Sequence, residues 1–216
     1  MQANVAIPSS ARPTDYFLDH FVAHKLASVT ECGAPELSTH GPWLTGFVLT
    51  STFRAKLPSD KRAYVFNFLR KAENAISHYK EARNALLEYV ATPRTVISPY
   101  FRSLSNLETC TAQCFQGFRL LSTGSQGSKK PFYKENDGSD LDRLRVIHYT
   151  SKHMDERIEN GEIPDEATAP IWITNNGIEA YGKKAVLTSL SFAELAALLI
   201  SMSDLANKLS KLEPKS

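Results

Sequence analysis

The spacing of apolar positions is helical along most of this chain, and it is clearest over residues 58–92. There, apolar side chains recur at three- and four-residue steps, which places them along one face of an α-helix. Pro58 opens this stretch and Pro93 follows it, so we predict one long helix between the two prolines. We expect its buried face to consist of Val65, Leu69, Ala72, Ile76, Tyr79, Leu86 and Val90.

A second long helix is predicted over residues 96–121 from the same periodicity. Only a few residues separate it from the first helix, so the two should lie antiparallel. Residues 122–139 are rich in glycine, serine and charged side chains and should form a long polar loop. The expected buried face of the second helix comprises Ile97, Phe101, Leu104, Leu107, Thr111, Cys114, Phe118 and Leu121.

A third helix is predicted over residues 140–159. Ser139 or Asp140 can cap its first turn, and Asn160-Gly161 is a typical helix end. The side chains that recur with helical spacing here, and should therefore face the core, are Leu141, Leu144, Ile147, Met154 and Ile158.

The C-terminal part combines short extended segments with one more helix. We predict a strand over residues 171–174, a turn at Asn175-Asn-Gly177 and a returning strand over residues 185–188. Ser191 and Glu194 have the spacing of a capping box, and an amphipathic last helix should follow them.

The N-terminal part has weaker signals. Residues 1–13 should form an extended tail, and a helix should begin at Thr14 or Asp15 and continue to about Val29. Glycines and prolines over residues 31–42 predict a loop, and residues 43–57 are predicted as a helix, although their valines and threonines also permit a strand. The buried side of the first helix should be Tyr16, Phe17, Phe21 and Leu26.

These elements predict a mainly α protein, built as an antiparallel helical bundle with a small C-terminal β-hairpin-like segment. Residues 1–57 would form an N-terminal tail and helical extension. Residues 58–216 would form the bundle with its strand, turn and last helix. We expect one compact domain overall, because no linker interrupts the periodic part of the chain.

The composition limits the classes of function. The net charge is only +2, so any nucleic-acid site must be local rather than spread over the whole surface. The three cysteines do not suggest a disulfide framework, and Cys110 and Cys114 are expected to be core residues. No apolar run is long enough to cross a membrane and no signal peptide is evident, so we expect a cytoplasmic protein that does not contact membranes.

Sequence motifs for metals and cofactors are missing. His20 and His24 have the spacing of a zinc-protease helix but lack its glutamate. The sequence contains neither a glycine-rich phosphate loop followed by lysine nor a nucleophile elbow. We therefore predict that the protein uses no metal and no cofactor.

The third helix concentrates the candidate chemistry. Helical spacing makes Arg145, His148, Tyr149 and Lys152 neighbours on one side, and His153 follows Tyr149 by four residues. A histidine can move a proton to or from an RNA hydroxyl, and an arginine can hold the scissile phosphate, so this set suits metal-free RNA cleavage. The alternative is an ordinary solvated helix face whose bases pair with nearby carboxylates.

The order of the helices resembles the HEPN superfamily, small helical domains of prokaryotic defence, toxin–antitoxin and RNA-processing systems. The resemblance covers roughly residues 58–160. It rests on the two long helices and on Arg143 and His148, which match the family's arginine, four to six residues, then histidine. The polar residue that often follows the family's arginine is Leu144 here.

The resemblance implies a site and a partner. Arg143 would hold a phosphate and His148 would act as general acid and base in a metal-independent endoribonuclease. Arg145, Tyr149, Lys152 and His153 would then contact the RNA. Family members of this kind form dimers, so a homodimer through the helix at residues 140–159 is expected.

Two alternatives stay open at this point. One is a non-catalytic HEPN-like interaction module that binds RNA, a nucleotide or a protein partner. The other is a helical structural protein unrelated to that family. The placement of His148 and of the arginines relative to an open cleft distinguishes the enzyme from the first alternative.

Overall fold

The computed structural model describes residues 13–38, 41–50, 58–92, 96–126, 133–165 and 167–210. Within these residues the protein is mainly α, with a small antiparallel sheet near the C-terminus, which confirms the predicted fold class. The predicted tail at residues 1–12 and the stretch 51–57 lie outside the described residues.

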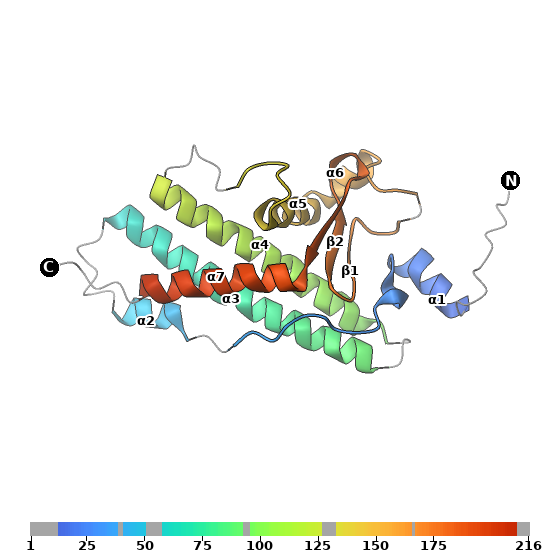
Figure 1. Cartoon of the computed structure of the whole chain (residues 1–216), viewed down its shortest axis with the longest axis horizontal. Helices are drawn as coiled ribbons and strands as arrows, with labels where there is room; N and C mark the ends of the chain where they lie inside the picture. Colours follow the sequence, from blue (N-terminus) through green and yellow to red (C-terminus); the bar gives the residue numbers. More distant parts are fainter. Residues whose placement is uncertain are drawn as a thin grey trace.

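Two long antiparallel helices, α3 (Ser59–Ala91) and α4 (Ser98–Gln126), form the body of the molecule (Figure 1). The prediction for α3 is confirmed almost to the residue. Four alanines lie on its buried face, and their small side chains let the two helices approach closely. The buried residues of α3 are Phe68, Leu69, Ala72, Ala75, Ile76, Tyr79, Ala82, Ala85, Leu86 and Tyr89.

Helix α4 differs from its prediction at the C-terminal end and on its buried face. It continues through residues 122–126, which were predicted as loop. Gly124 lies against the ring of Tyr64, where an added Cβ would be 3.1 Å from Cγ, so packing on α3 outweighs the weak helical propensity of this stretch. Phe101, predicted to be buried, is 37% exposed, while its neighbour Tyr100 is fully buried.

The last helix, α7 (Phe192–Ser210), lies along the α3–α4 pair and begins at the predicted capping box. The backbone N–H of Glu194 donates to Ser191 Oγ at 3.2 Å, and the N–H of Ser191 donates to the Glu194 carboxylate at 2.8 Å. The short helix α2 (Trp43–Leu49) covers the other end of α7, where Trp43 Nε1 donates to Asn207 Oδ1 at 2.8 Å. Residues 43–49 are therefore helical, as predicted, and do not form the alternative strand.

The sheet has three antiparallel strands in the order β1 (Ile171–Ile173), β2 (Gly177–Tyr181) and β3 (Leu187–Ser191). The first strand and the turn after it agree with the prediction. The middle strand was not predicted, and the returning strand begins two residues late, because a 3₁₀ turn at Lys183–Ala185 comes first. Strand β2 pairs on both edges, so the two adjoining strands β1 and β3 stabilise its extended conformation.

The predicted N-terminal helix is broken. It consists of α1 (Pro13–Phe17), a π-helical turn η1 (Leu18–Val22) and a 3₁₀ turn η2 (Leu26–Ser28). The burial prediction is wrong for Phe17 and Phe21, which are 62% and 63% exposed, and right for Leu26. The predicted helix does not continue to Val29, because the chain turns and places Leu26 in the core. There the Tyr89 hydroxyl donates a hydrogen bond to the Leu26 carbonyl oxygen.

An extended segment then carries the chain across the bundle, consistent with the loop predicted there. Gly33 donates its N–H to the Asn175 carbonyl at 2.8 Å, and Tyr79 donates its hydroxyl to the Pro35 carbonyl at 2.9 Å. A Cβ on Gly33 would lie 2.6 Å from the Asn175 oxygen, so this close approach requires glycine. The buried apolar residues of this part, including Val29, belong to the same core as the long helices.

The predicted third helix forms two helices, α5 (Asp140–Lys152) and α6 (Met154–Glu159), separated at His153 by φ −117° and ψ 39°. The break changes which residues of α6 face inward. Ile158, predicted as core, is 59% exposed, and Arg157 is buried instead. In the part of the chain that the structure describes, no helix is both long and apolar enough to cross a membrane.

Candidate functional site

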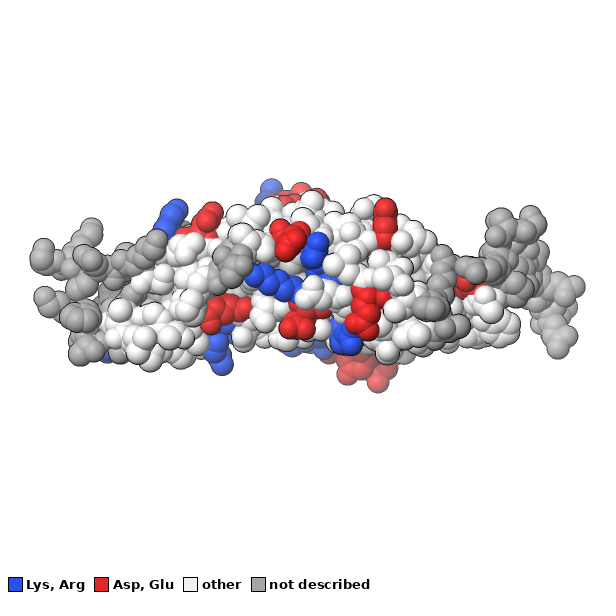
Figure 2. Space-filling view, turned by 90° about the horizontal axis from the view of Figure 1, so that it is seen from below, with Lys and Arg blue, Asp and Glu red and all other residues white. Residues whose placement is uncertain are grey.

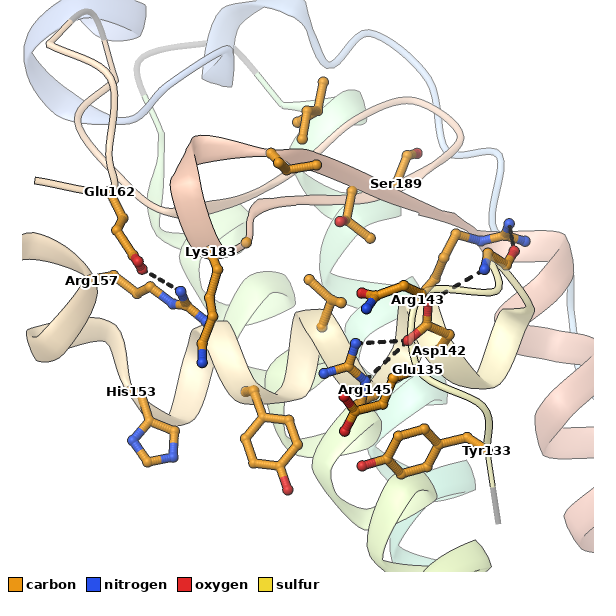
Figure 3. Close-up of a pocket in the computed structure, with 18 of the residues that line it drawn as sticks. Tyr133, Glu135, Asp142, Arg143, Arg145, His153, Arg157, Glu162, Lys183 and Ser189 are labelled. Atoms are coloured by element: carbon orange, nitrogen blue, oxygen red, sulfur yellow. Dashed lines mark hydrogen bonds and ion pairs between the residues drawn. The ribbon is translucent and has the colours of Figure 1, made fainter. Parts of the chain in front are cut away.

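A groove of about 1030 Å³ lies between α5–α6 and the β2–β3 hairpin, with the chain before α5 at one end (Figure 3). It is the best candidate site in the described residues because charged and aromatic side chains converge on it. Its lining residues from the helices and their ends include Asp142, Arg143, Arg145, Val146, Tyr149, His153, Glu156, Arg157, Asn160 and Glu162. Tyr133, Glu135, Lys183, Val186, Thr188 and Ser189 are among those from the other segments.

The hairpin wall is held close to α5 by two contacts. Thr150 Oγ1 on α5 donates to the Tyr181 carbonyl oxygen at 3.1 Å. Gly182 lies against Val146, and a Cβ there would be 3.0 Å from Cγ1 of that valine. The glycine therefore permits the hairpin to approach the helix, and this approach brings Lys183 to the groove.

The helical wall is a row of side chains spaced four residues apart. Arg145, Tyr149, His153 and Arg157 all line the groove. Four residues advance an α-helix by one turn and roughly 40°, so such positions form a nearly continuous row. His153 separates α5 from α6, and Arg157 of α6 still lines the groove.

At one end of the groove, Arg145 is fixed by Asp142. Arg145 donates from Nε and Nη2 to Asp142 Oδ1, at 3.1 and 2.7 Å. Its guanidinium also lies over the Tyr133 ring, 5.4 Å from the ring centre. Asp142 is only 5% exposed, so a buried carboxylate holds the cation beside an aromatic ring at the groove surface.

At the other end, Arg157 and Lys183 place two cations close together (Figure 3). Arg157 pairs with Glu162, and its side chain is only 10% exposed. The hydrogen bond from Arg157 lowers the pKa of the Glu162 carboxyl more than any other interaction, and the positive charge of Lys183 lowers it further. His153 lies nearby and pairs with Glu156 at 3.1 Å.

Arg143 lines the groove, but its guanidinium is already engaged. It pairs with Asp140 at 2.7 Å and with Glu194 at 2.6 Å, and it donates to the Gly138 carbonyl oxygen at 2.5 Å. These contacts join the first turn of α5 to the first turn of α7. Arg143 therefore has a structural role, because it links the N-termini of two helices.

His148 does not line the groove. The centre of its ring lies 5.0 Å from the ring centre of Phe115 on α4 and 5.5 Å from that of Tyr149. The residue is 8% exposed. Burial, followed by the charges of Lys152, His153 and Arg119, lowers its pKa to about 4. This histidine is therefore neutral at neutral pH.

Within one chain, the structure does not bring Arg143 and His148 together. Five residues along an α-helix correspond to a rotation of about 140°, so the two side chains leave α5 in different directions. Arg143 lies toward α7, and His148 lies toward α4. A site that used both would need a second molecule or a rearrangement of the helix.

A search of family models, curated proteins and solved structures found no match. Among the described residues, no three histidine, cysteine, aspartate or glutamate side chains are grouped as metal ligands would be.

Three of the four residues predicted to contact RNA line the groove, namely Arg145, Tyr149 and His153. The fourth, Lys152, is exposed and does not line it. The site residues predicted from the sequence did not include Tyr133, Arg157, Glu162 and Lys183, although Arg157 belongs to the basic cluster of the third helix. The four-residue spacing from His153 could have indicated Arg157, but Lys183 lies on a hairpin that gave no such signal.

The distribution of charged side chains on another face of the molecule also favours the groove as the candidate site. Figure 2 shows the molecule from below the view of Figure 1, and on this face the described acidic and basic side chains are interspersed. A face of mixed charge has no strong attraction for a polyanion. The described lining of the groove also balances four Lys or Arg side chains with four carboxylates, so what distinguishes the groove is that the rings of Tyr133 and Tyr149 accompany its cations.

Proposed function

We propose that this chain is a HEPN-like module that binds single-stranded RNA in the groove between α5–α6 and the β2–β3 hairpin, without cleaving it. The observation that carries the proposal is the row Arg145, Tyr149, His153 and Arg157, faced by Lys183 across the groove. Cations that contact phosphates, interleaved with rings on which bases stack, are the general means of binding single strands.

The size of the groove supports an oligonucleotide segment. Its volume of about 1030 Å³ is at the top of the range of roughly 300–1,000 Å³ typical of small-ligand pockets. Tyr133 and Arg145 lie at one end and Arg157 and Lys183 at the other, as Figure 3 shows. A short stretch of RNA could contact both ends at once.

The state of His148 supports binding over cleavage. A general acid and base must reach the proton that it transfers, at roughly 2.6–3.2 Å or through one water. His148 packs against Phe115 outside the groove, and Arg143 is engaged by Asp140 and Glu194. The groove therefore has the groups to hold RNA, but Arg143 and His148 are not aligned in it.

The proposal is tested by fluorescence anisotropy with labelled single-stranded and duplex RNA at low salt. We expect binding of the single strand and a loss of roughly five-fold or more in Tyr149→Leu, because stacking on an aromatic ring contributes about 1–3 kcal/mol per base. Leucine keeps the apolar packing of Tyr149 against Phe115. Lys152→Ala is the matched control, because this exposed lysine on the same helix does not line the groove.

Two outcomes would contradict groove binding. One is the absence of measurable binding to any RNA. The other is an equal loss in Tyr149→Leu and Lys152→Ala, which would place the RNA on the exposed helix face instead.

The endoribonuclease activity implied by the family resemblance is tested in the same samples. Single-stranded RNA is incubated with the wild type and with His148→Ala in EDTA, and the products are separated on a denaturing gel. The binding proposal expects intact RNA in both. Cleavage that depends on His148, together with a dimer through α5 and α6 in sedimentation, would favour the enzyme.

A further inference from the structure

Arg157 lies at one end of the groove and is largely buried. Its side chain is 10% exposed, and Figure 3 shows it in the cavity wall beside Lys183. Its Nε is fully buried and has no hydrogen-bond partner among the described residues. A guanidinium has five N–H donors, and among the described residues the only acceptor of Arg157 is the Glu162 carboxylate, so donors other than the buried Nε remain for an anion in the groove.

The Glu162 carboxylate occupies this basic end. It accepts a hydrogen bond from Arg157, and the pKa of the carboxyl is lowered chiefly by that bond. The positive charge of Arg157, a hydrogen bond from the Lys184 backbone N–H and the charge of Lys183 lower the pKa further. Guanidinium, ammonium and backbone N–H groups around one anionic group are also the usual ligands of a phosphate.

The hairpin tip that provides Lys183 has an unusual backbone. Lys184 and Ala185 adopt left-handed conformations, with φ values of 58° and 56°. Residues other than glycine rarely adopt this conformation, and such positions are frequent at ligand sites. Among the described residues, Lys183 itself forms no ion pair within 4.0 Å.

We propose that Arg157, Lys183 and the Lys184 backbone N–H form a site for the terminal phosphate of an RNA strand, and that Glu162 is a built-in competitor for it. This inference rests on the proposed binding of RNA in the groove. A terminal phosphomonoester carries a charge of about −1.5 to −2 at neutral pH. An internal phosphodiester carries a single charge, as Glu162 does, so only the terminal phosphate gains charge attraction when it displaces the carboxylate.

The test compares RNA strands of one sequence that end in a 5′-phosphate, a 3′-phosphate or hydroxyls. Binding is measured by anisotropy for the wild type, Glu162→Gln, Lys183→Ala and Glu159→Gln. We expect the wild type to prefer one phosphorylated end by about ten-fold, because charge-assisted hydrogen bonds are among the strongest polar contacts. Glu162→Gln should increase that preference, and Lys183→Ala should reduce it.

Glu159→Gln is the matched control. It removes the same charge from an exposed residue of α6 that does not line the groove. Its preference for the phosphorylated end should equal that of the wild type. An equal increase in Glu159→Gln and Glu162→Gln would mean that net charge alone is responsible, and would overturn the assignment of Glu162.

The failure of this inference can be distinguished from the failure of RNA binding. If all three strands bind equally to the wild type and to Glu162→Gln, the terminal-phosphate site is refuted while groove binding stands. If no strand binds, the proposed function itself is wrong. Inorganic phosphate is added as a competitor, and its binding without any preference among the strands would assign the site to free phosphate and refute the RNA-end inference.

Discussion

At the scale of single residues, His148 shows how burial changes the chemistry of a side chain. Its sequence position suggested an acid and base, but its ring packs against Phe115 and its pKa is lowered to about 4. A histidine in an unfolded chain has a pKa near 6.5. Between about pH 6.5 and pH 4, the unfolded state therefore binds a proton that the folded state does not bind.

It follows that the stability of the protein should decrease as the pH falls through this window, and that His148→Leu should reduce this decrease. Leucine is apolar and has no proton to gain. We would measure the free energy of unfolding by urea denaturation at about pH 7 and about pH 5 for both proteins. Equal losses in the two proteins would show that His148 titrates normally in the folded state.

At the scale of elements, the helix starts obey local rules. Ser139 Oγ accepts the N–H of Asp142 at 3.3 Å, and Ser191 forms its capping box with Glu194. Both were predicted, because a cap involves residues three apart in the chain. The break at His153 was not predicted, because it depends on how α6 packs on the rest of the molecule.

The capping box of α7 should contribute measurably to stability. We expect Ser191→Ala to lower the free energy of unfolding by about 1 kcal/mol, because the N–H of Glu194 loses its acceptor. Ser201→Ala is the control, since Ser201 is exposed in the middle of the same helix and bonds only to the Ala197 carbonyl. That control should change stability by less than about 0.5 kcal/mol. Similar losses in both variants in urea denaturation would argue against the cap.

At the scale of the whole molecule, one buried tyrosine joins the sheet to the long helices. Tyr100 of α4 is fully buried, and its hydroxyl oxygen accepts the N–H of Ile173 in β1 at 3.0 Å. Burial raises the pKa of this hydroxyl, which stays neutral. The sheet forms one wall of the groove, so this contact also supports the site.

Tyr100→Phe should destabilise the protein by about 1–3 kcal/mol, because the buried N–H of Ile173 loses its acceptor while the packing of the ring is kept. Tyr149→Phe is a suitable comparison, since that hydroxyl lines the groove and has no hydrogen bond with the described residues. Thermal denaturation of both variants gives the difference. A melting temperature for Tyr100→Phe equal to that of Tyr149→Phe would contradict the proposed role of the contact.

The sequence by itself determined the long helices and the start of α7. Their apolar periodicity and their caps are properties of residues within one or two turns of each other. It also predicted one face with Arg145, His148, Tyr149 and Lys152, and a further pair of Tyr149 with His153; of these residues, Arg145, Tyr149 and His153 line the groove and the other two do not. Cys110 and Cys114 were predicted as core residues because no second pair of cysteines completes a metal site, and both are fully buried.

Only the tertiary structure decided which of these residues face a common space. Phe115 of α4 packs against His148 of α5. Lys183 lines the groove from the turn between β2 and β3, and β2 forms the middle of the sheet by pairing with both β1 and β3. Periodicity indicates the face of a helix on which a residue lies, but not which distant segment packs against that face. The groove, in which Lys183 of the hairpin lies beside Arg157 of α6, is therefore a product of packing between segments far apart in the chain.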